Sequence, residues 1–179
     1  MGALGLQTLA LLGLTSAIGV GLLLLVAAVD QWRHRALLPG IVANYRLLPA
    51  ALVGPAATAL PFAEGAIGAA LIAGLHPLAS LAGIALLLLF AGAMAVNIRR
   101  GRGHIDCGCG HGALRHPIGW GLVARNLGLA ALLGLRFVPA TNFAVADIAT
   151  AVAGGTTLFL LSQLSNSLFN LAASPVHRR

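Results

Sequence analysis

Long apolar runs, separated by short polar segments, form most of this chain. The runs follow neither the 3.6-residue period of an amphipathic helix nor the two-residue alternation of a half-buried strand. A helix needs about 20 residues to cross a bilayer core of about 30 Å. Five runs approach or exceed that length, at about residues 3–29, 49–74, 77–96, 117–135 and 143–164. Because the last run is the most polar, the pattern predicts an all-α bundle of four to five transmembrane helices, with residues 1–179 in one integral membrane domain.

The composition also indicates a membrane protein. Hydrophobic residues make up 59% of the chain and charged residues 8%, whereas a soluble domain usually carries about 25% charged residues. The formal charge of +7 comes from eleven arginines against four acidic residues. The arginines cluster between the apolar runs, which suits anionic lipid headgroups better than a nucleic-acid groove. We therefore expect the lipid bilayer, and no nucleic acid, around this chain.

The positions of the arginines predict an orientation. Three clusters lie between the first and second runs, between the third and fourth runs, and at the end of the chain: Arg33, Arg35 and Arg46; Arg99, Arg100, Arg102 and Arg115; Arg178 and Arg179. If the runs alternate across the membrane, these nine share one side and Arg136 lies on the other. The positive-inside rule then places the amino terminus outside and the segment between the third and fourth runs, which contains Cys107, on the cytoplasmic side. A signal peptide is the rival interpretation of residues 3–29, although the run exceeds an h-region of 7–15 residues and lacks a basic start.

The segment at residues 97–116 carries the most distinctive chemistry of the chain. It contains both cysteines, Cys107 and Cys109, with Gly108 between them. Two cysteines this close can form a disulfide, but the small ring would be strained, and strained disulfides are labile. Gly108 can adopt backbone conformations that a side chain would forbid. The pair is therefore a candidate redox site.

Charged neighbours would set the reactivity of these thiols. Arg99 and Arg102 favour the thiolate, which is the reactive form, whereas Asp106 opposes it. We therefore predict Cys107 and Cys109 as the catalytic residues of a thiol–disulfide oxidoreductase, supported by these charged neighbours and by Gly108.

Other interpretations of the same segment stay open. Two sulfur and two nitrogen ligands suit zinc or copper(I), and the segment offers such a set in Cys107, Cys109, His111 and His104. The spacing differs from that of a usual zinc finger, and the histidines are equally consistent with a solvated loop. On these interpretations the chain is a soft-metal carrier, or a non-catalytic membrane scaffold that presents the loop to a partner.

Two ionisable residues lie inside the predicted spans. Charges within a membrane are costly, so they suggest function by default. Glu64 follows Pro61 by about one helical turn, and prolines kink helices and free backbone carbonyls, so this segment could line a polar cavity. Arg125 lies in the fourth run. Both residues are also consistent with purely structural hydrogen bonding in the bundle.

Small residues recur every four positions in two of the runs. Gly13, Ala17 and Gly21 form one such row, and Gly65, Ala69 and Ala73 form the other. Rows of this kind allow helices to approach closely in lipid. The abundance of glycine and alanine in this chain explains the rows equally well.

Several segments resemble the MauE family of methylamine utilisation proteins, which are DoxX/MauE-like integral membrane proteins. The likeness covers roughly residues 20–135 and lies in Tyr45–Pro49, Leu60–Glu64, Asn97–Arg102, Ile105–Gly110, Ile118–Trp120 and Arg125–Asn126. Its most specific part is the Asp-Cys-Gly-Cys stretch, which begins at Asp106, in its arginine-rich setting.

The resemblance implies a maturation factor in the bacterial inner membrane. The family is associated with the methylamine dehydrogenase small subunit, an exported disulfide-rich client, and is thought to act beside the thioredoxin-like, membrane-anchored protein MauD. Cys107 and Cys109 would then cycle between dithiol and disulfide. We expect no bound cofactor; with only two cysteines in the chain, the other half-reaction needs a partner thiol protein or a quinone as electron partner.

Overall fold

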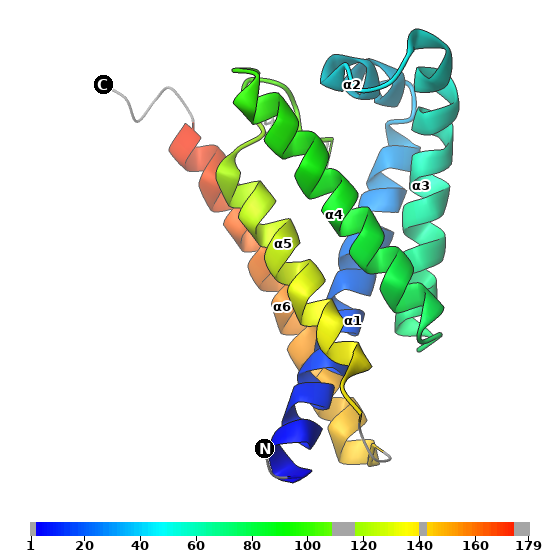
Figure 1. Cartoon of the computed structure of the whole chain (residues 1–179), viewed down its shortest axis with the longest axis vertical. Helices are drawn as coiled ribbons and strands as arrows, with labels where there is room; N and C mark the ends of the chain where they lie inside the picture. The colour runs from blue at the N-terminus through cyan, green and yellow to red at the C-terminus, as the bar shows by residue number, and fades with distance from the viewer. Residues whose placement is uncertain (1–2, 109–116, 140–142, 174–179) are drawn as a thin grey trace.

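The computed structural model describes residues 3–108, 117–139 and 143–173 of the chain, and these residues are mostly helical (Figure 1). In chain order the elements are α1 (Ala3–Arg33), α2 (Leu38–Tyr45), α3 (Ala50–Ile72), α4 (Leu78–Arg99), α5 (Trp120–Gly134), the 3-10 helix η1 (Leu135–Phe137) and α6 (Val145–Ala173). Across the described ranges, the only β-type pairing is a single bridge between Asp106 and Pro117. The predicted all-α membrane bundle is confirmed.

Four of the helices are long and apolar enough to cross a membrane: Leu4–Arg33, Ala50–Ile72, Leu78–Arg99 and Val145–Ser165. The run at residues 117–135 instead holds α5, whose 15 residues rise only about 22 Å at 1.5 Å per residue. It is short because Pro117 takes part in the bridge with Asp106, so the helix begins only at Trp120. The polar run at residues 143–164, by contrast, largely coincides with one of the four long helices, Val145–Ser165.

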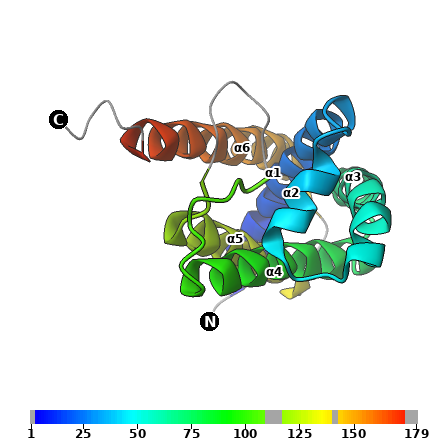
Figure 2. The ribbon, with the colours of Figure 1, turned by 90° about the horizontal axis from the view of Figure 1, so that it is seen from above.

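The longest helix, α1, runs through the bundle and packs along both α3 and α6, whereas α4 packs along α5 (Figure 2). The main hydrophobic core lies where α1, α3, α4 and α5 meet, and Val20 and Leu133 are fully buried there. Glycines bring α1 and α3 together: a Cβ placed on Gly68 would lie 2.8 Å from the carbonyl oxygen of Gly21. This approach lets the two backbones touch.

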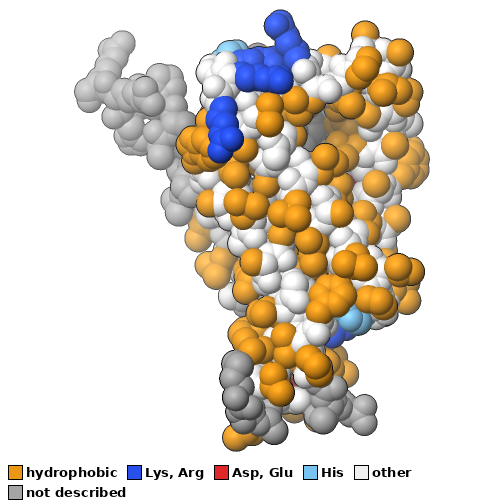
Figure 3. Space-filling view, in the orientation of Figure 1, with side chains coloured by type: hydrophobic (Ala, Val, Ile, Leu, Met, Phe, Trp, Pro, Cys, Tyr) orange, Lys and Arg blue, Asp and Glu red, His pale blue; other side chains and the backbone are white. Residues whose placement is uncertain are grey.

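The helices α3 and α4 diverge from their short connection, and α2 lies across the end of the bundle where they are far apart (Figures 1 and 2). Sequence patterns did not predict α2, because its eight residues lie between two apolar runs. The helix ends at Tyr45, and the positive φ of 48° at the next residue, Arg46, turns the chain toward α3. The end of the bundle that α2 covers is also the end at which the arginines of the face shown in Figure 3 gather.

Candidate functional site

Arg102 links the segment after α4 to the end of α2 through hydrogen bonds. Its Nη1 donates to Asn97 Oδ1 at 2.9 Å and to the carbonyl oxygen of Tyr45 at 3.3 Å, and its Nη2 donates to the carbonyl oxygen of Asn44. A guanidinium suits this position, because the carbonyls at a helix carboxyl terminus carry partial negative charge. Arg102, predicted as an aid to thiolate formation, therefore has a direct structural contact with α2. Arg99 lies exposed at the last residue of α4.

A short backbone pairing holds the two ends of the cysteine segment together. The N–H of Ile118 donates to the carbonyl oxygen of Ile105 at 3.0 Å, next to the bridge between Asp106 and Pro117. Both isoleucines are buried in a second hydrophobic cluster between α4 and α5. Asp106 and Pro117, although eleven positions apart in the sequence, therefore lie next to each other.

Cys107 is half-buried and packs against that second cluster. Its carbonyl oxygen accepts a hydrogen bond of 3.2 Å from the Tyr45 hydroxyl. Gly108 has a φ of +75°, a conformation that favours glycine, and a Cβ there would lie 3.1 Å from Ile41 Cγ2. The other predicted catalytic residue, Cys109, lies outside the described residues.

A cavity of about 320 Å³ lies beneath this segment, inside the bundle. Every α-helix contributes to its walls, which are mostly apolar. The surface is hollowed beside α4, below the arginine-bearing end of the molecule (Figure 3). The polar and thiol side chains on the walls are Gln31, Tyr45, Glu64, Cys107, Arg125, Asn126 and Gln163.

Glu64 is 1% exposed and lies on the α3 wall of this cavity. The side-chain amide of Gln31, near the end of α1, donates to Glu64 Oε1 at 3.0 Å and to Oε2 at 3.1 Å. A buried carboxyl group is costly unless hydrogen bonds compensate it, and Gln31 supplies two of them. Sequence reasoning missed Gln31, because it stands among the charged residues that follow the first apolar run. Its spacing from Glu64 in the sequence carries no signal.

Arg125 and Asn126 form the polar part of the α5 wall. The Nη2 of Arg125 donates to Asn126 Oδ1 at 3.3 Å, and the Asn126 side chain is 2% exposed. The two intramembrane charges predicted from the sequence, Glu64 and Arg125, therefore line the same cavity as Cys107. This convergence is the main feature of the site.

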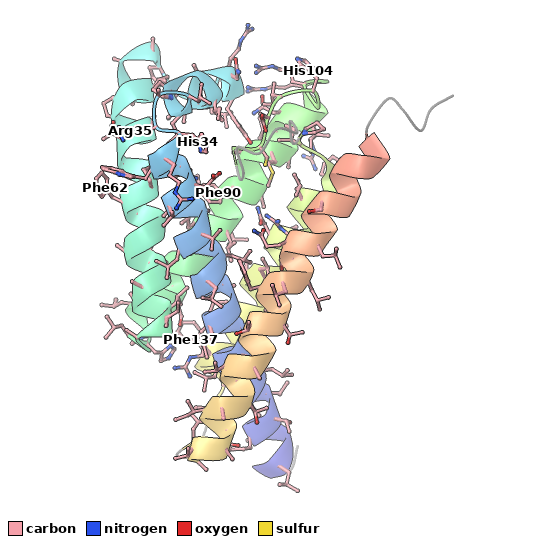
Figure 4. All side chains as sticks on the ribbon, turned by 180° about the vertical axis from the view of Figure 1, so that it is seen from behind. His34, Arg35, Phe62, Phe90, His104 and Phe137 are labelled. Carbon is pink, nitrogen blue, oxygen red and sulfur yellow. The ribbon has the colours of Figure 1, made fainter. Side chains whose placement is uncertain are left out.

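Few residues at the opposite end of the bundle are charged. His76 follows α3, its Nδ1 lies 3.2 Å from Ser80 Oγ, and its ring lies 4.8 Å from that of Phe137, which Figure 4 labels. Burial, followed by the nearby charge of Arg136, lowers the pKa of His76 below its usual value of 6.5. The imidazole is therefore biased toward its neutral form, which keeps this end low in charge.

The predicted metal ligands are only partly placed. Within the part of the chain that the structure describes, no group of three or more His, Cys, Asp or Glu residues could hold a metal ion. His104 is exposed on the segment after α4, near the arginine-bearing end (Figure 4). Cys109 and His111 lie outside the described residues.

The fold and the site define a class of protein: a polytopic helical membrane protein in which a cysteine segment caps an intramembrane cavity. Comparison with known families narrows this class. The family model described as methylamine utilisation protein MauE matches residues 9–139, which include nearly all of the cavity walls. The chain belongs to the MauE family, and the predicted family resemblance is confirmed.

Three named relatives match this chain over most of their length. The chain is 37% identical over 161 residues to methylamine utilization protein MauE of Paracoccus denitrificans, covering 87% of this chain and 86% of the relative. It is 38% identical over 164 residues to the MauE of Methylophilus methylotrophus, covering 87% and 84%. It is 39% identical over 145 residues to the MauE of Methylorubrum extorquens, covering 78% of each. No solved structure gives a significant match.

Proposed function

We propose that this protein is an accessory factor of methylamine utilisation that exchanges disulfides through Cys107 and Cys109 in the bacterial inner membrane. The names of its relatives support the pathway. The observation that carries the mechanism is that Cys107, Glu64 and Arg125 line one cavity. A thiol that shares a mostly apolar cavity with a carboxyl group and a guanidinium is suited to proton-coupled thiol chemistry.

The proposed exchange forms a disulfide in an exported client such as the methylamine dehydrogenase small subunit. A client thiolate attacks one sulfur of the Cys107–Cys109 disulfide and forms a mixed disulfide, and the attacked bond releases the other cysteine as a thiolate. A second client thiolate then attacks the mixed disulfide. The client gains a disulfide bond, and two electrons and two protons remain on Cys107 and Cys109 as thiols.

The reduced pair must then be oxidised again. A membrane-anchored thioredoxin-like protein of the MauD type is one partner that could accept the two electrons, since its own disulfide would be reduced to a dithiol in the same kind of exchange. The mechanism requires a client and an electron acceptor, and a protein of this type is one kind of acceptor.

Serine substitutions test the exchange. Cys107→Ser and Cys109→Ser should each abolish client maturation while the protein stays in the membrane. The variant that keeps the attacking cysteine should accumulate a mixed disulfide with its partner, because no second thiol remains to release it. Non-reducing gels, followed by mass spectrometry of the trapped species, measure this.

A matched control uses a thiol in another place. In the background without Cys107 and Cys109, Leu75→Cys creates an exposed thiol at the opposite end of the bundle, and it should trap no partner. Full maturation activity in the double serine variant would refute both disulfide exchange and the metal-carrier alternative, and would favour a scaffold. Loss of a bound metal from both single variants, without any covalent trapping, would favour the metal carrier.

A further inference from the structure

Two buried amides in the cavity have an atom without a hydrogen-bond partner among the described residues. They are the acceptor Gln31 Oε1 and the donor Asn126 Nδ2. Both side chains line the cavity and are 4% and 2% exposed. Native proteins rarely bury such atoms unsatisfied, so each indicates a ligand or an ordered water.

Neighbouring charges set which way these amides face. The Nε2 of Gln31 is directed to the Glu64 carboxyl group, so its oxygen faces elsewhere. The Oδ1 of Asn126 accepts from the Arg125 guanidinium, so its nitrogen is left to donate. The cavity therefore offers one acceptor and one donor, on α1 and α5, to whatever occupies it.

The rest of the cavity is apolar. Leu60 of α3 and Leu87 and Phe90 of α4 line it, where these two helices diverge within the membrane-spanning part of the bundle (Figure 1). Its volume of about 320 Å³ lies in the range of small-molecule sites. Water would satisfy the amides, but it would not favourably occupy the apolar part of the cavity. An occupant with a small polar head and an apolar tail matches both parts.

We propose that the cavity binds a lipid-soluble para-quinone, which accepts the electrons of the Cys107–Cys109 dithiol. A quinone carbonyl oxygen accepts from Asn126 Nδ2, and a quinol hydroxyl donates to Gln31 Oε1, so the two amides serve both redox forms. A phospholipid is the rival occupant: the Glu64 carboxyl group would repel its phosphate and Arg125 would attract it, so the test includes it. Cys107 lines the same cavity, so the thiol and the quinone would share it.

This proposal rests on the proposed disulfide exchange and names its electron acceptor. In the step, the two S–H bonds break and one S–S bond forms. Two electrons and two protons pass to the quinone, where its two carbonyl oxygens become the hydroxyl groups of the quinol. The products are the disulfide, which is ready for the next client, and a quinol that diffuses into the bilayer.

The test uses the full chain in lipid nanodiscs with decylubiquinone as the probe. Equilibrium binding is measured first. Electron transfer is then followed as the loss of oxidised quinone after mixing with the chain, whose cysteines have been reduced and separated from the reductant. We expect saturable binding of one quinone per chain, and one quinol formed for each disulfide.

Three variants test the position of the site. Asn126→Leu keeps the volume but removes the donor, and should weaken binding about tenfold, the size of one lost hydrogen bond. Leu60→Trp narrows the apolar part without changing either amide, and should also weaken binding, so the test stands if Asn126→Leu does not fold. Thr156→Val is a matched polar-to-apolar change on an exposed position of α6, and should bind as the wild type does.

The double variant Cys107→Ser/Cys109→Ser separates this proposal from the function on which it rests. It should bind decylubiquinone normally and fail to reduce it. Lack of saturable binding, or binding that Asn126→Leu and Leu60→Trp leave unchanged, would overturn the quinone site, while covalent trapping by the single cysteine variants would still support disulfide exchange. Binding without reduction by the wild-type dithiol, or a phospholipid that the quinone does not displace, would also overturn it.

Discussion

At the scale of single residues, Glu64 and Arg125 act either through their charges or only through their hydrogen bonds. The Gln31 amide donates to both carboxyl oxygens, and these hydrogen bonds offset part of the cost of burying the carboxyl group. Arg125 lines the same cavity and donates to Asn126. If these groups serve only to join helices, amides could replace them; if they act on protons or on a thiolate, the charges are needed.

We predict that Glu64→Gln and Arg125→Gln each reduce client maturation more than they reduce the amount of protein in the membrane, with activity per molecule falling about tenfold or more. Amide replacements retain hydrogen bonding and remove the charge, so a selective loss of activity implicates proton or thiolate chemistry. The measurement is mature client per amount of membrane protein.

Asp147→Asn is the matched control for this prediction. It removes an acidic charge from the first turn of α6, where Asp147 accepts from the backbone N–H of Ala144 at 2.9 Å. We expect normal activity. Equal losses of protein level and activity in Glu64→Gln and Arg125→Gln would show that these residues have a structural role.

At the scale of helices, the close approach of α1 and α3 positions Gln31 opposite Glu64. The predicted row on α1 takes part in close approaches: a Cβ on Gly13 would lie 2.6 Å from the backbone of Leu135, and one on Gly21 would lie 2.9 Å from the carbonyl oxygen of Gly68. On α3 the tight contact falls on Gly68, outside the predicted row, whereas a Cβ on Gly65 would have only an ordinary contact of 3.5 Å. The crossing of the helices, not the spacing of small residues, selects the contact.

We predict that Gly68→Ala destabilises the bundle by about 1–3 kcal/mol, as overpacking does in other protein interiors. The new methyl group would meet the Gly21 carbonyl oxygen and the Leu25 backbone nitrogen, at 2.8 and 3.1 Å, and backbone atoms cannot rotate away. Gly54→Ala, on the same helix but with nothing within 4 Å of the new methyl group, should stabilise the protein by roughly 0.5–1 kcal/mol. Thermal unfolding in detergent measures both; equal effects would contradict the close-packing explanation.

At the scale of the whole molecule, the arginines distinguish the two ends of the bundle. Arg33 and Arg99 end α1 and α4, and Arg102 holds the cysteine segment at the same end. The opposite end carries Arg136 and a histidine, His76, whose pKa is lowered. The positive-inside rule predicts that the cysteine end faces the cytoplasm. Since the proposed client is exported, this orientation requires either that the cysteine segment re-enters the membrane or that the helices expose the pair alternately to the two sides.

We predict that a membrane-impermeant maleimide does not label reduced Cys107 and Cys109 in intact cells, and labels them once the cells are permeabilised. In the background without these cysteines, Leu75→Cys at the opposite end is exposed and should be labelled in intact cells. Mass shifts on gels report the labelling. Ready labelling of the native pair from outside, with protection of Leu75→Cys, would reverse the orientation.

The sequence by itself determined the class of protein and located its cysteine segment. Apolar runs long enough to span a bilayer require helices, because lipid offers no partner to an unpaired backbone group. The arginine clusters, the Cys-Gly-Cys pair and the family resemblance are local features, so they can be read without a fold. Glu64 and Arg125 were also found in this way, since a charge within an apolar run is conspicuous wherever the helix packs.

Only the tertiary structure decided how these residues combine. That Cys107, Glu64 and Arg125 line one cavity depends on the crossing of α1 with α3 and on the divergence of α3 from α4. No period along the chain encodes either feature, because almost every position in these helices is apolar. For the same reason, the sequence did not predict that Gln31 is the partner of Glu64, that α2 covers the end of the bundle, or that α5 is short. In a chain of nearly uniform hydropathy, the contacts between helices, and not the pattern within each one, distinguish a lining residue from a lipid-facing one.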